Sequence, residues 1–353
     1  MTPVGPSGVQ RSVDRVRQLT AADLGLANPA DAAPAPAPDD ERLDDLGIGD
    51  DDPLLATTLD LLDTYDGIIF AGPPGTSKSW YASNIALKLT KGNPHLVRFV
   101  QFHPSYQYED FVEGYVPTGT GGFELRPKHL LELAELAEDH PGEWVVLVID
   151  ELSRGDPGRI FGEALTYVEK SKRELKFHLS SGTELSLPTN LVFLATMNPL
   201  DRGVDEVDAA FERRFAKIAM EPDAALLEQF LVSAGMGSAL RERVQTFFRA
   251  ANSRSIDNPY AAVGHTFFLD VGDESGLRRL WEHQLRFLFA KAYQLEPEGL
   301  AEVRRAWDRI FVPAPTGAPA PSDASEVKPA DNVGVEATPI VETPPPESPA
   351  TSA

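Results

Sequence analysis

The sequence contains no cysteine and no long apolar run, and its bases are far outnumbered by acids. Without cysteine the chain can form neither disulfide bonds nor thiolate metal sites, which fits a cytoplasmic location. No segment approaches the roughly 18 apolar residues of a transmembrane helix, and the N-terminus lacks an apolar signal core. We therefore expect a cytoplasmic protein that makes no contact with a membrane.

Basic residues are scarce, since 32 lysines and arginines accompany 54 acids and give a net charge of −22. Part of the excess lies in residues 21–66, where thirteen acids stand beside a single base. The body of the chain is mildly acidic. Affinity for a nucleic-acid backbone rests on lysine and arginine contacts. We therefore expect the chain to meet DNA only indirectly, through a partner or a fused domain.

Both ends of the chain have compositions that are typical of disorder. Residues 1–53 contain an Ala-Pro run and acidic clusters, with too little apolar content to repay the entropy of folding. The 41 residues of 313–353 include ten prolines among Ser, Thr, Ala and acids. We expect disordered termini, an acidic N-terminal segment and a Pro-rich tail, that act as passive extensions. The alternative is that they dock a partner.

A glycine-rich loop follows an apolar run that predicts a buried strand, and it precedes a predicted helix. The loop consists of Gly72, Pro73, Pro74, Gly75, Thr76, Ser77, Lys78 and Ser79. In this context the backbone N–H groups and the helix N-terminus bind a polyphosphate. We expect Lys78 to neutralise the β- and γ-phosphates and Ser79 to ligate Mg²⁺.

Ser77 stands where such loops usually have glycine. That glycine commonly serves a conformation with φ > 0, which costs another residue about 1 kcal/mol. A loop bound to triphosphate can absorb this strain, so the substitution weakens the match without removing it. An ordinary Pro/Gly turn is the alternative for the loop taken alone.

Two acids end a second apolar strand, expected over 145–149. Asp150 is placed to hold Mg²⁺ through its water shell, and Glu151 to polarise the attacking water as a general base. Paired carboxylates repel each other and must be solvated or paired, so packing alone rarely places them at the end of a buried strand. Two acids at an exposed strand end are the alternative.

A third apolar strand, expected over 191–197, ends at Asn198, whose amide can orient the hydrolytic water. Farther along, Arg213 and Arg214 follow an acid. Such a pair is usually a solvated helix face. Here it follows a strand of the nucleotide site, which favours a charge-stabilising finger that reaches a neighbouring subunit's phosphate.

The order of these motifs resembles that of AAA+ ATPases, and their wording resembles the McrB-like, dynein-related branch, which is related to MoxR. The resemblance covers about residues 65–300. It is carried by QFHPSYQYEDFVEG at 101–114, IDELSRG at 149–155 with IFGE at 160–163, MNPLDR at 197–202, where the branch has MNTADR, and GHTFF at 264–268.

The resemblance implies roles for individual residues. Asn198 corresponds to the sensor asparagine. Asp201 and Arg202 fill the signature element that helps to position water and to receive a stimulating partner. Arg213 and Arg214 match the trans-acting arginine positions of the family.

The resemblance also implies a function, that of an AAA+ nucleoside triphosphatase working as a hexameric ring motor. It would be the McrB-like motor subunit of a restriction or defence-type complex, with a separate nuclease or effector subunit. We expect ATP rather than GTP as the substrate, with Mg²⁺, and no DNA-recognition domain in the chain. The alternatives are a MoxR-like AAA+ chaperone that remodels a protein partner and an inactive nucleotide-gated scaffold.

Alternating apolar runs and helical stretches predict an α/β fold with a doubly wound parallel five-stranded sheet. The strands are expected at 67–71, 97–103, 145–149, 191–197 and 216–220, the first of them central. Two hairpins are expected near 123–125 and over 174–185, and the resemblance places both at a pore. Residues 54–222 would form this AAA+ nucleotide-binding domain.

From residue 223 to 312 the spacing of apolar residues changes to that of helices, over 225–231, 240–250 and 277–293. This pattern predicts a smaller helical lid domain. We expect its core to include His265, Trp281, Phe287 and Phe289, with the histidine packed and hydrogen-bonded rather than acting as a ligand.

Overall fold

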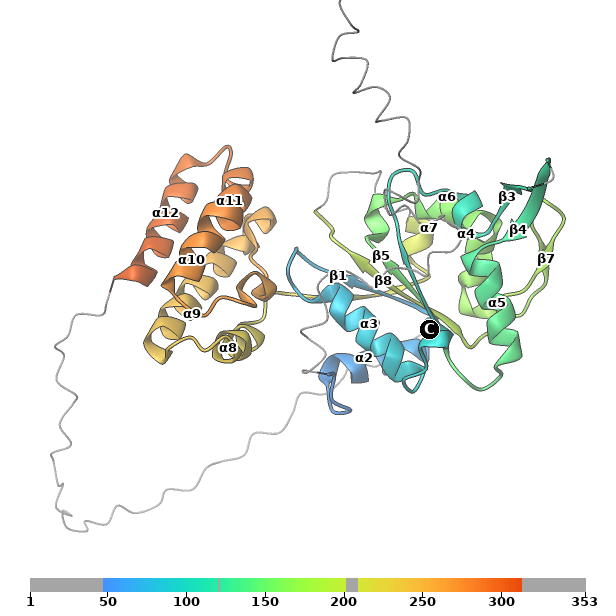
Figure 1. Cartoon of the computed structure of the whole chain (residues 1–353), viewed down its shortest axis with the longest axis horizontal. Coiled ribbons are helices and arrows are strands. Elements are labelled where there is room, and N and C mark those ends of the chain that lie inside the picture. Colours follow the sequence, from blue (N-terminus) through green and yellow to red (C-terminus); the bar gives the residue numbers. More distant parts are fainter. Residues whose placement is uncertain (1–46, 120, 201–208, 313–353) are drawn as a thin grey trace, which may run out of the picture. The chain divides into compact units, whose positions relative to one another are not determined.

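The computed structural model describes residues 47–119, 121–200 and 209–312. At its centre lies a five-stranded parallel sheet in the order β2-β5-β8-β1-β9 (Figure 1). The strands are β1 (Gly67–Ala71), β2 (Val97–Gln101), β5 (Val145–Asp150), β8 (Leu191–Met197) and β9 (Ala216–Ala219). All five predicted strands are confirmed. β1 lies inside the sheet, between β8 and β9, but the middle position belongs to β8 and not, as expected, to β1.

Continuous burial explains why these strands are apolar throughout. Every residue of β8 is buried, as are the first four of β1 and the first five of β5. Parallel strands covered on both faces have this pattern, because each successive side chain points into one of two cores. Ile69 and Phe193 face one core, whereas Ile68 and Val192 face the other. The fold is therefore doubly wound, as predicted.

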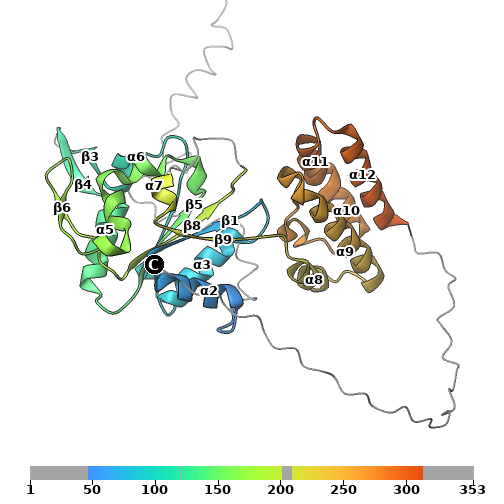
Figure 2. The same ribbon diagram turned by 180° about the vertical axis from the view of Figure 1, so that it is seen from behind.

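Helices cover both faces of the sheet (Figures 1 and 2). One core contains residues of α2 (Pro53–Leu62) and α3 (Lys78–Leu89). The other contains residues of α4 (Tyr108–Phe111), α5 (His129–Asp139), α6 (Pro157–Phe161) and α7 (Ala209–Glu212). Rings of the QFHPSYQYEDFVEG segment pack in this second core, where Phe102 and Phe111 meet edge to face at 5.9 Å. That segment therefore serves the packing of the domain.

The N-terminal end of the described chain is ordered earlier than its composition indicates. Ile48, which we placed in the acidic disordered segment, is buried against the core of α2 and α3. Asp52 caps α2 by accepting hydrogen bonds from the amides of Leu54 and Leu55. Asp50 pairs with Lys88 at 2.8 Å. Burial of Ile48, the helix cap of Asp52 and the ion pair of Asp50 together position residues 48–52.

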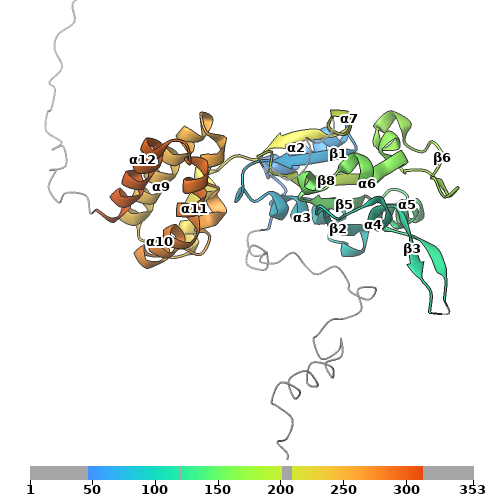
Figure 3. The same ribbon diagram turned by 90° about the horizontal axis from the view of Figure 1, so that it is seen from above.

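Two antiparallel hairpins extend from the sheet domain at the end where α5 lies (Figures 1 and 3). One joins β3 (Glu113–Pro117) to β4 (Phe123–Pro127), and the other joins β6 (Phe177–His178) to β7 (Glu184–Leu185). Both were predicted. Thr183 of the second hairpin donates a hydrogen bond to the buried Glu113 of the first, at 3.0 Å. The two insertions therefore support each other.

A buried ion pair closes the base of the second hairpin. The guanidinium of Arg173 pairs with Asp66 at 3.0 Å and donates hydrogen bonds to the carbonyls of Pro188 and Leu191. Both charged side chains are almost fully buried. This arrangement ties the insertion to the residue before β1 and to the first residue of β8.

The lid is helical from residue 224 onward. It consists of α8 (Ala224–Ser233), α9 (Ser238–Ser253), α10 (Glu274–Leu280), a π-helical turn (Trp281–Leu285), α11 (Arg286–Ala292) and α12 (Pro297–Asp308). Its core includes Trp281, Trp307 and Phe289, and Trp281 stacks on Trp307 at 5.1 Å. The helix α12 was not predicted from the sequence. The prediction that Phe287 belongs to the lid core is wrong, because this residue is 58% exposed, with the Arg286 guanidinium over its ring.

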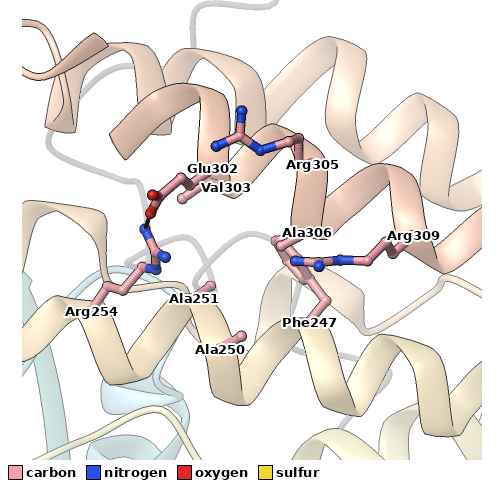
Figure 4. Close-up of a pocket in the computed structure, with 9 residues that line it drawn as sticks. All are labelled: Phe247, Ala250, Ala251, Arg254, Glu302, Val303, Arg305, Ala306 and Arg309. Carbon is pink, nitrogen blue, oxygen red and sulfur yellow. Dashed lines mark ion pairs between the residues drawn. The ribbon is translucent and has the colours of Figure 1, made fainter. Parts of the chain in front are cut away.

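A hollow of about 260 Å³ lies between α9 and α12 (Figure 4). It is lined by Phe247, Ala250, Ala251, Arg254, Glu302, Val303, Arg305, Ala306 and Arg309. In Figure 4 Arg254 faces Glu302, with which it forms an ion pair. All these residues belong to the lid, so the hollow is not part of the predicted nucleotide site. Among the residues that the structure describes, no helix is long and apolar enough to cross a membrane.

Candidate nucleotide-binding site

The glycine-rich loop leaves β1 at a point where the chain is tightly packed. The Gly72 amide donates a hydrogen bond to the carbonyl of Met197, at the end of β8. A side chain at this position would meet the carbonyl oxygen of Met220 at 2.1 Å. Gly72 is therefore required for the loop to start between β8 and β9.

Polar groups from three segments meet at the carboxyl ends of β5 and β8. The Ser79 hydroxyl, on the first turn of α3, donates a hydrogen bond to Asp150 Oδ1 at 2.8 Å. The Thr196 hydroxyl donates to the same oxygen at 2.6 Å. Lys78 Nζ donates to the Pro73 carbonyl at 2.7 Å, so its ammonium group lies against the loop. The structure thus brings together three of the predicted residues.

Thr196 belongs to this hydrogen-bonded set but was not predicted from the sequence. Besides its bond to Asp150, its hydroxyl accepts a hydrogen bond from the Glu151 amide at 3.1 Å. It therefore fixes both acids relative to β8. A hydroxyl inside the otherwise apolar strand Leu191–Met197, two residues before Asn198, was the available signal.

Glu151 adopts a left-handed backbone conformation, with φ = 56°. Such a conformation is uncommon for a residue other than glycine and marks a position that its surroundings hold. The half-buried carboxylate pairs with Arg154 Nε at 3.1 Å. The backbone thus changes direction at Glu151, directly after β5 ends at Asp150.

The predicted residues that follow β8 are Asn198, Asp201 and Arg202, and the structure describes only the first of them. Asn198 is half-buried, and its side-chain oxygen accepts a hydrogen bond from the Leu200 amide at 3.1 Å. Asp201 and Arg202 lie outside the residues that the structure describes.

The two arginines that the sequence analysis treated alike differ in exposure. Arg213 is exposed, whereas Arg214 is 8% exposed. A side chain buried within its own chain is less accessible to a neighbour. Arg213 is therefore the more accessible of the two, and the trans-acting role of Arg213 and Arg214 stays a prediction.

Ser77 has φ = 60°, the left-handed conformation expected for the position that usually holds glycine. Its hydroxyl lies 2.8 Å from Nε2 of His265 in the lid. Nδ1 of His265 accepts a hydrogen bond from the Asp223 amide at 3.1 Å. Burial lowers the pKa of His265 to about 4, so the ring is neutral near pH 7. The histidine is packed and hydrogen-bonded as predicted, but its contact with the loop was not foreseen.

Comparison with known proteins agrees with this geometry. Residues 67–215 match the family model of the AAA domain of the dynein-related subfamily. The chain is 33% identical over 203 residues to the type IV methyl-directed restriction enzyme EcoKMcrB subunit of Escherichia coli K12, covering 55% of this chain and 44% of that protein. Residues 67–215 therefore match an AAA domain of the dynein-related subfamily, and the chain is similar in sequence to this McrB subunit.

A second relative of the AAA+ domain is the type II restriction enzyme BsuMI component YdiS of Bacillus subtilis 168. Identity is 27% over 188 residues, 42% of this chain and 55% of that protein. The chain thus spans about half the length of the curated relatives it matches. A crystal structure from Cytophaga hutchinsonii aligns over 71% of this chain and 78% of its own, with 14% identity and a TM-score of 0.34, too slight a likeness to bear on the argument.

The donor atoms of the AAA+ site fit Mg²⁺ better than a softer metal. Ser79 Oγ and Asp150 Oδ1 are hard oxygen donors 2.8 Å apart, and Mg²⁺ is commonly held by one or two protein groups together with water and substrate phosphates. Among the described residues no group of three or more His, Cys, Asp or Glu side chains could hold a metal ion. A magnesium site that the substrate completes therefore suits these residues, and a zinc site does not.

Proposed function

We propose that the AAA+ domain hydrolyses a nucleoside triphosphate, ATP rather than GTP, at the carboxyl ends of β1, β5 and β8. The observation that carries the proposal is the hydrogen-bonded set of Ser79, Asp150, Thr196 and Glu151 beside the glycine-rich loop. It joins the phosphate-binding loop after β1 to two acids at the end of β5, across the intervening strand β8. This is the arrangement that phosphoryl transfer to water requires.

Each predicted residue then has a proposed role. Residues 72–79 bind the phosphates, and Lys78 exchanges its bond to the Pro73 carbonyl for one to a phosphate oxygen. Ser79 and Asp150 hold Mg²⁺, which neutralises phosphate charge when bound. Glu151 accepts a proton from the attacking water, and Asn198 orients that water. Asp201 and Arg202 complete the water-positioning element.

We further propose that the domain works as a ring motor, in which six copies each complete a neighbour's site through Arg213. The exposure of Arg213 supports this role, because a trans-acting guanidinium must extend from its own subunit. Both curated relatives are components of restriction enzymes. By analogy the chain would be the motor of a restriction complex, with a separate nuclease or effector subunit and only indirect contact with DNA.

A MoxR-like chaperone is the second candidate. It is favoured by the hairpin β3–β4, on which Tyr115 and Phe123 are 69% and 75% exposed. Exposed aromatic rings suit contact with a protein segment as well as with nucleic acid. The identity of the partner that raises turnover decides between the two.

The test measures turnover of ATP and of GTP with Mg²⁺ by the concentrated protein. Glu151→Gln should bind nucleotide and lose turnover by about 10²- to 10⁴-fold, whereas Lys78→Ala should lose binding. Glu282→Gln is a matched control, since it removes a glutamate paired with an arginine in the lid. Wild-type turnover no higher than that of Glu151→Gln, with either nucleotide, would refute the proposal.

A further inference from the structure

Ser77 connects the phosphate loop to the lid. It occupies a left-handed conformation, with φ = 60°, that a serine adopts only at a cost in free energy. Glycine would take the same conformation without this cost. The serine hydroxyl, however, bonds across 188 residues of sequence to Nε2 of His265. The loop therefore gains a lid contact that glycine could not make.

The direction of this hydrogen bond follows from the other nitrogen of the ring. Nδ1 of His265 accepts from the Asp223 amide, so the proton of the neutral imidazole resides on Nε2. Nε2–H therefore donates to Ser77 Oγ at 2.8 Å. The ring is 1% exposed, so breaking the bond would leave a buried donor without water.

The backbone around this bond is closely packed. The Thr266 amide donates to the Gly75 carbonyl at 3.1 Å. A side chain on Gly264 would meet the Gly75 carbonyl oxygen at 2.0 Å and the Pro74 carbonyl oxygen at 2.5 Å. The segment 264–266 thus lies directly on the loop, and only a glycine at its start allows this approach.

We propose that Ser77 and His265 form a latch that holds the phosphate loop in its left-handed conformation and makes nucleotide affinity depend on the lid. The inference rests on the proposed function and adds a positioning residue to it. When the lid contact is broken, Ser77 loses the bond that offsets its backbone strain, and the loop relaxes. Nucleotide binding and lid contact therefore favour each other, because linkage is reciprocal.

Four variants test the latch. Ser77→Ala removes the hydroxyl, and Ser77→Gly removes both hydroxyl and strain. His265→Asn keeps an acceptor near the Asp223 amide but is too short to reach Ser77. His265→Gln is the conservative variant, because its amide can place an N–H near the position of Nε2. Ser83→Ala is the matched control, since Ser83 donates a bond of the same 2.8 Å length within α3 itself.

The first measurement is hydrogen exchange without nucleotide at the Thr266 amide, which donates to the Gly75 carbonyl of the loop. We expect exchange about 2- to 10-fold faster in Ser77→Ala, Ser77→Gly and His265→Asn, and near wild-type rates in His265→Gln and Ser83→Ala. The double variant Ser77→Ala/His265→Asn should exchange no faster than either single variant, because both remove one bond. Thermal melting confirms folding, and Ser77→Ala alone carries the test if His265→Asn does not fold.

The second measurement is the dissociation constant for nucleotide. It should rise about 2- to 10-fold in Ser77→Ala and in His265→Asn. In His265→Asn, which changes no residue of the phosphate loop, kcat at saturation should stay close to wild type. Unchanged exchange in both variants, or additive effects in the double variant, would overturn the latch even if the wild type hydrolyses nucleotide. If the wild type shows no turnover while hydrogen exchange in the variants follows the expected pattern, the proposed function is refuted and the latch is not.

Discussion

Two serines two residues apart in the same loop bond to different parts of the molecule. Ser79 donates to Asp150 of the sheet, and Ser77 accepts from His265 of the lid, both at 2.8 Å. The sheet supplies Asp150, Glu151 and Asn198, which we expect to take part in hydrolysis. The lid supplies the neutral ring of His265, to which we assign no part in the chemistry. The comparison separates residues that would act on the substrate from a residue that positions the loop.

The largest effect is expected from a residue that is neither on the sheet side nor on the lid side of the same chain, namely Arg213 of a neighbouring subunit. Arg213→Ala should lower kcat by about 10³-fold or more if its guanidinium completes a neighbour's site. Arg214→Ala should instead lower the free energy of unfolding by about 1–3 kcal/mol, because its side chain is buried. Steady-state kinetics and denaturant unfolding separate the two effects.

Mixing Arg213→Ala subunits with Glu151→Gln subunits provides the control, since some interfaces then combine an intact glutamate with an intact arginine. Turnover above that of either variant alone is expected. Full activity of Arg213→Ala, or of the wild type at high dilution, would show that one chain holds the complete site.

The lid side can be tested by its response to pH. The pKa of His265 is about 4 in the folded protein against 6.5 for the unperturbed side chain. Burial is the main cause, partly opposed by Asp223. Because the unfolded chain binds the proton more readily, stability is fully present above pH 6.5 and is lost as the pH falls toward 4. The loss should approach about 3 kcal/mol.

Unfolding free energies at several values between pH 7 and pH 4 check this expectation. His265→Gln does not titrate, so the difference between wild type and variant should shift in favour of the variant as the pH falls. Parallel pH profiles would contradict it.

A smaller effect is expected when the close contact between the lid and the loop is tested at Gly264. Gly264→Ala should destabilise the protein by about 1–3 kcal/mol, because the added carbon would lie 2.0 Å from the Gly75 carbonyl oxygen. Gly237→Ala is the matched control, since it has a similar extended backbone in the lid and nothing within 4 Å of the new carbon. It should change stability by less than about 0.5 kcal/mol. Equal effects in thermal melts would argue against the contact.

The sequence predicted the sheet well because its strands are continuous apolar runs, a signal that burial on both faces makes strong. The left-handed conformation of Ser77 was also predictable, from the glycine that usually stands there. Burial of Ile48 was not, because a lone apolar residue among acids gains its place only from tertiary packing. The helix α12 was missed although its two buried residues, Val303 and Trp307, lie four residues apart among charged residues, which is helical spacing.

The site was predicted in its parts but not in its connections. Asp150 and Ser79 were recognisable by position, whereas Thr196 was hidden by its place in an apolar strand. The contact between Ser77 and His265 spans 188 positions, and no local pattern records such a pairing. The burial of Arg214 beside the exposed Arg213 likewise depends on how the turn before β9 packs.

The ion pair of Arg173 and Asp66 has a mechanical consequence. The two chain ends of the insertion that carries β6 and β7 are joined at its base. There the Glu174 amide donates to the Leu187 carbonyl at 3.0 Å, and Arg173 donates to the carbonyls of Pro188 and Leu191. A pull on the hairpin tip would therefore load the first residues of β1 and β8 together. Those strands carry the glycine-rich loop and Asn198 at their other ends. Tension at the hairpin would thus travel along the two strands that end at the nucleotide.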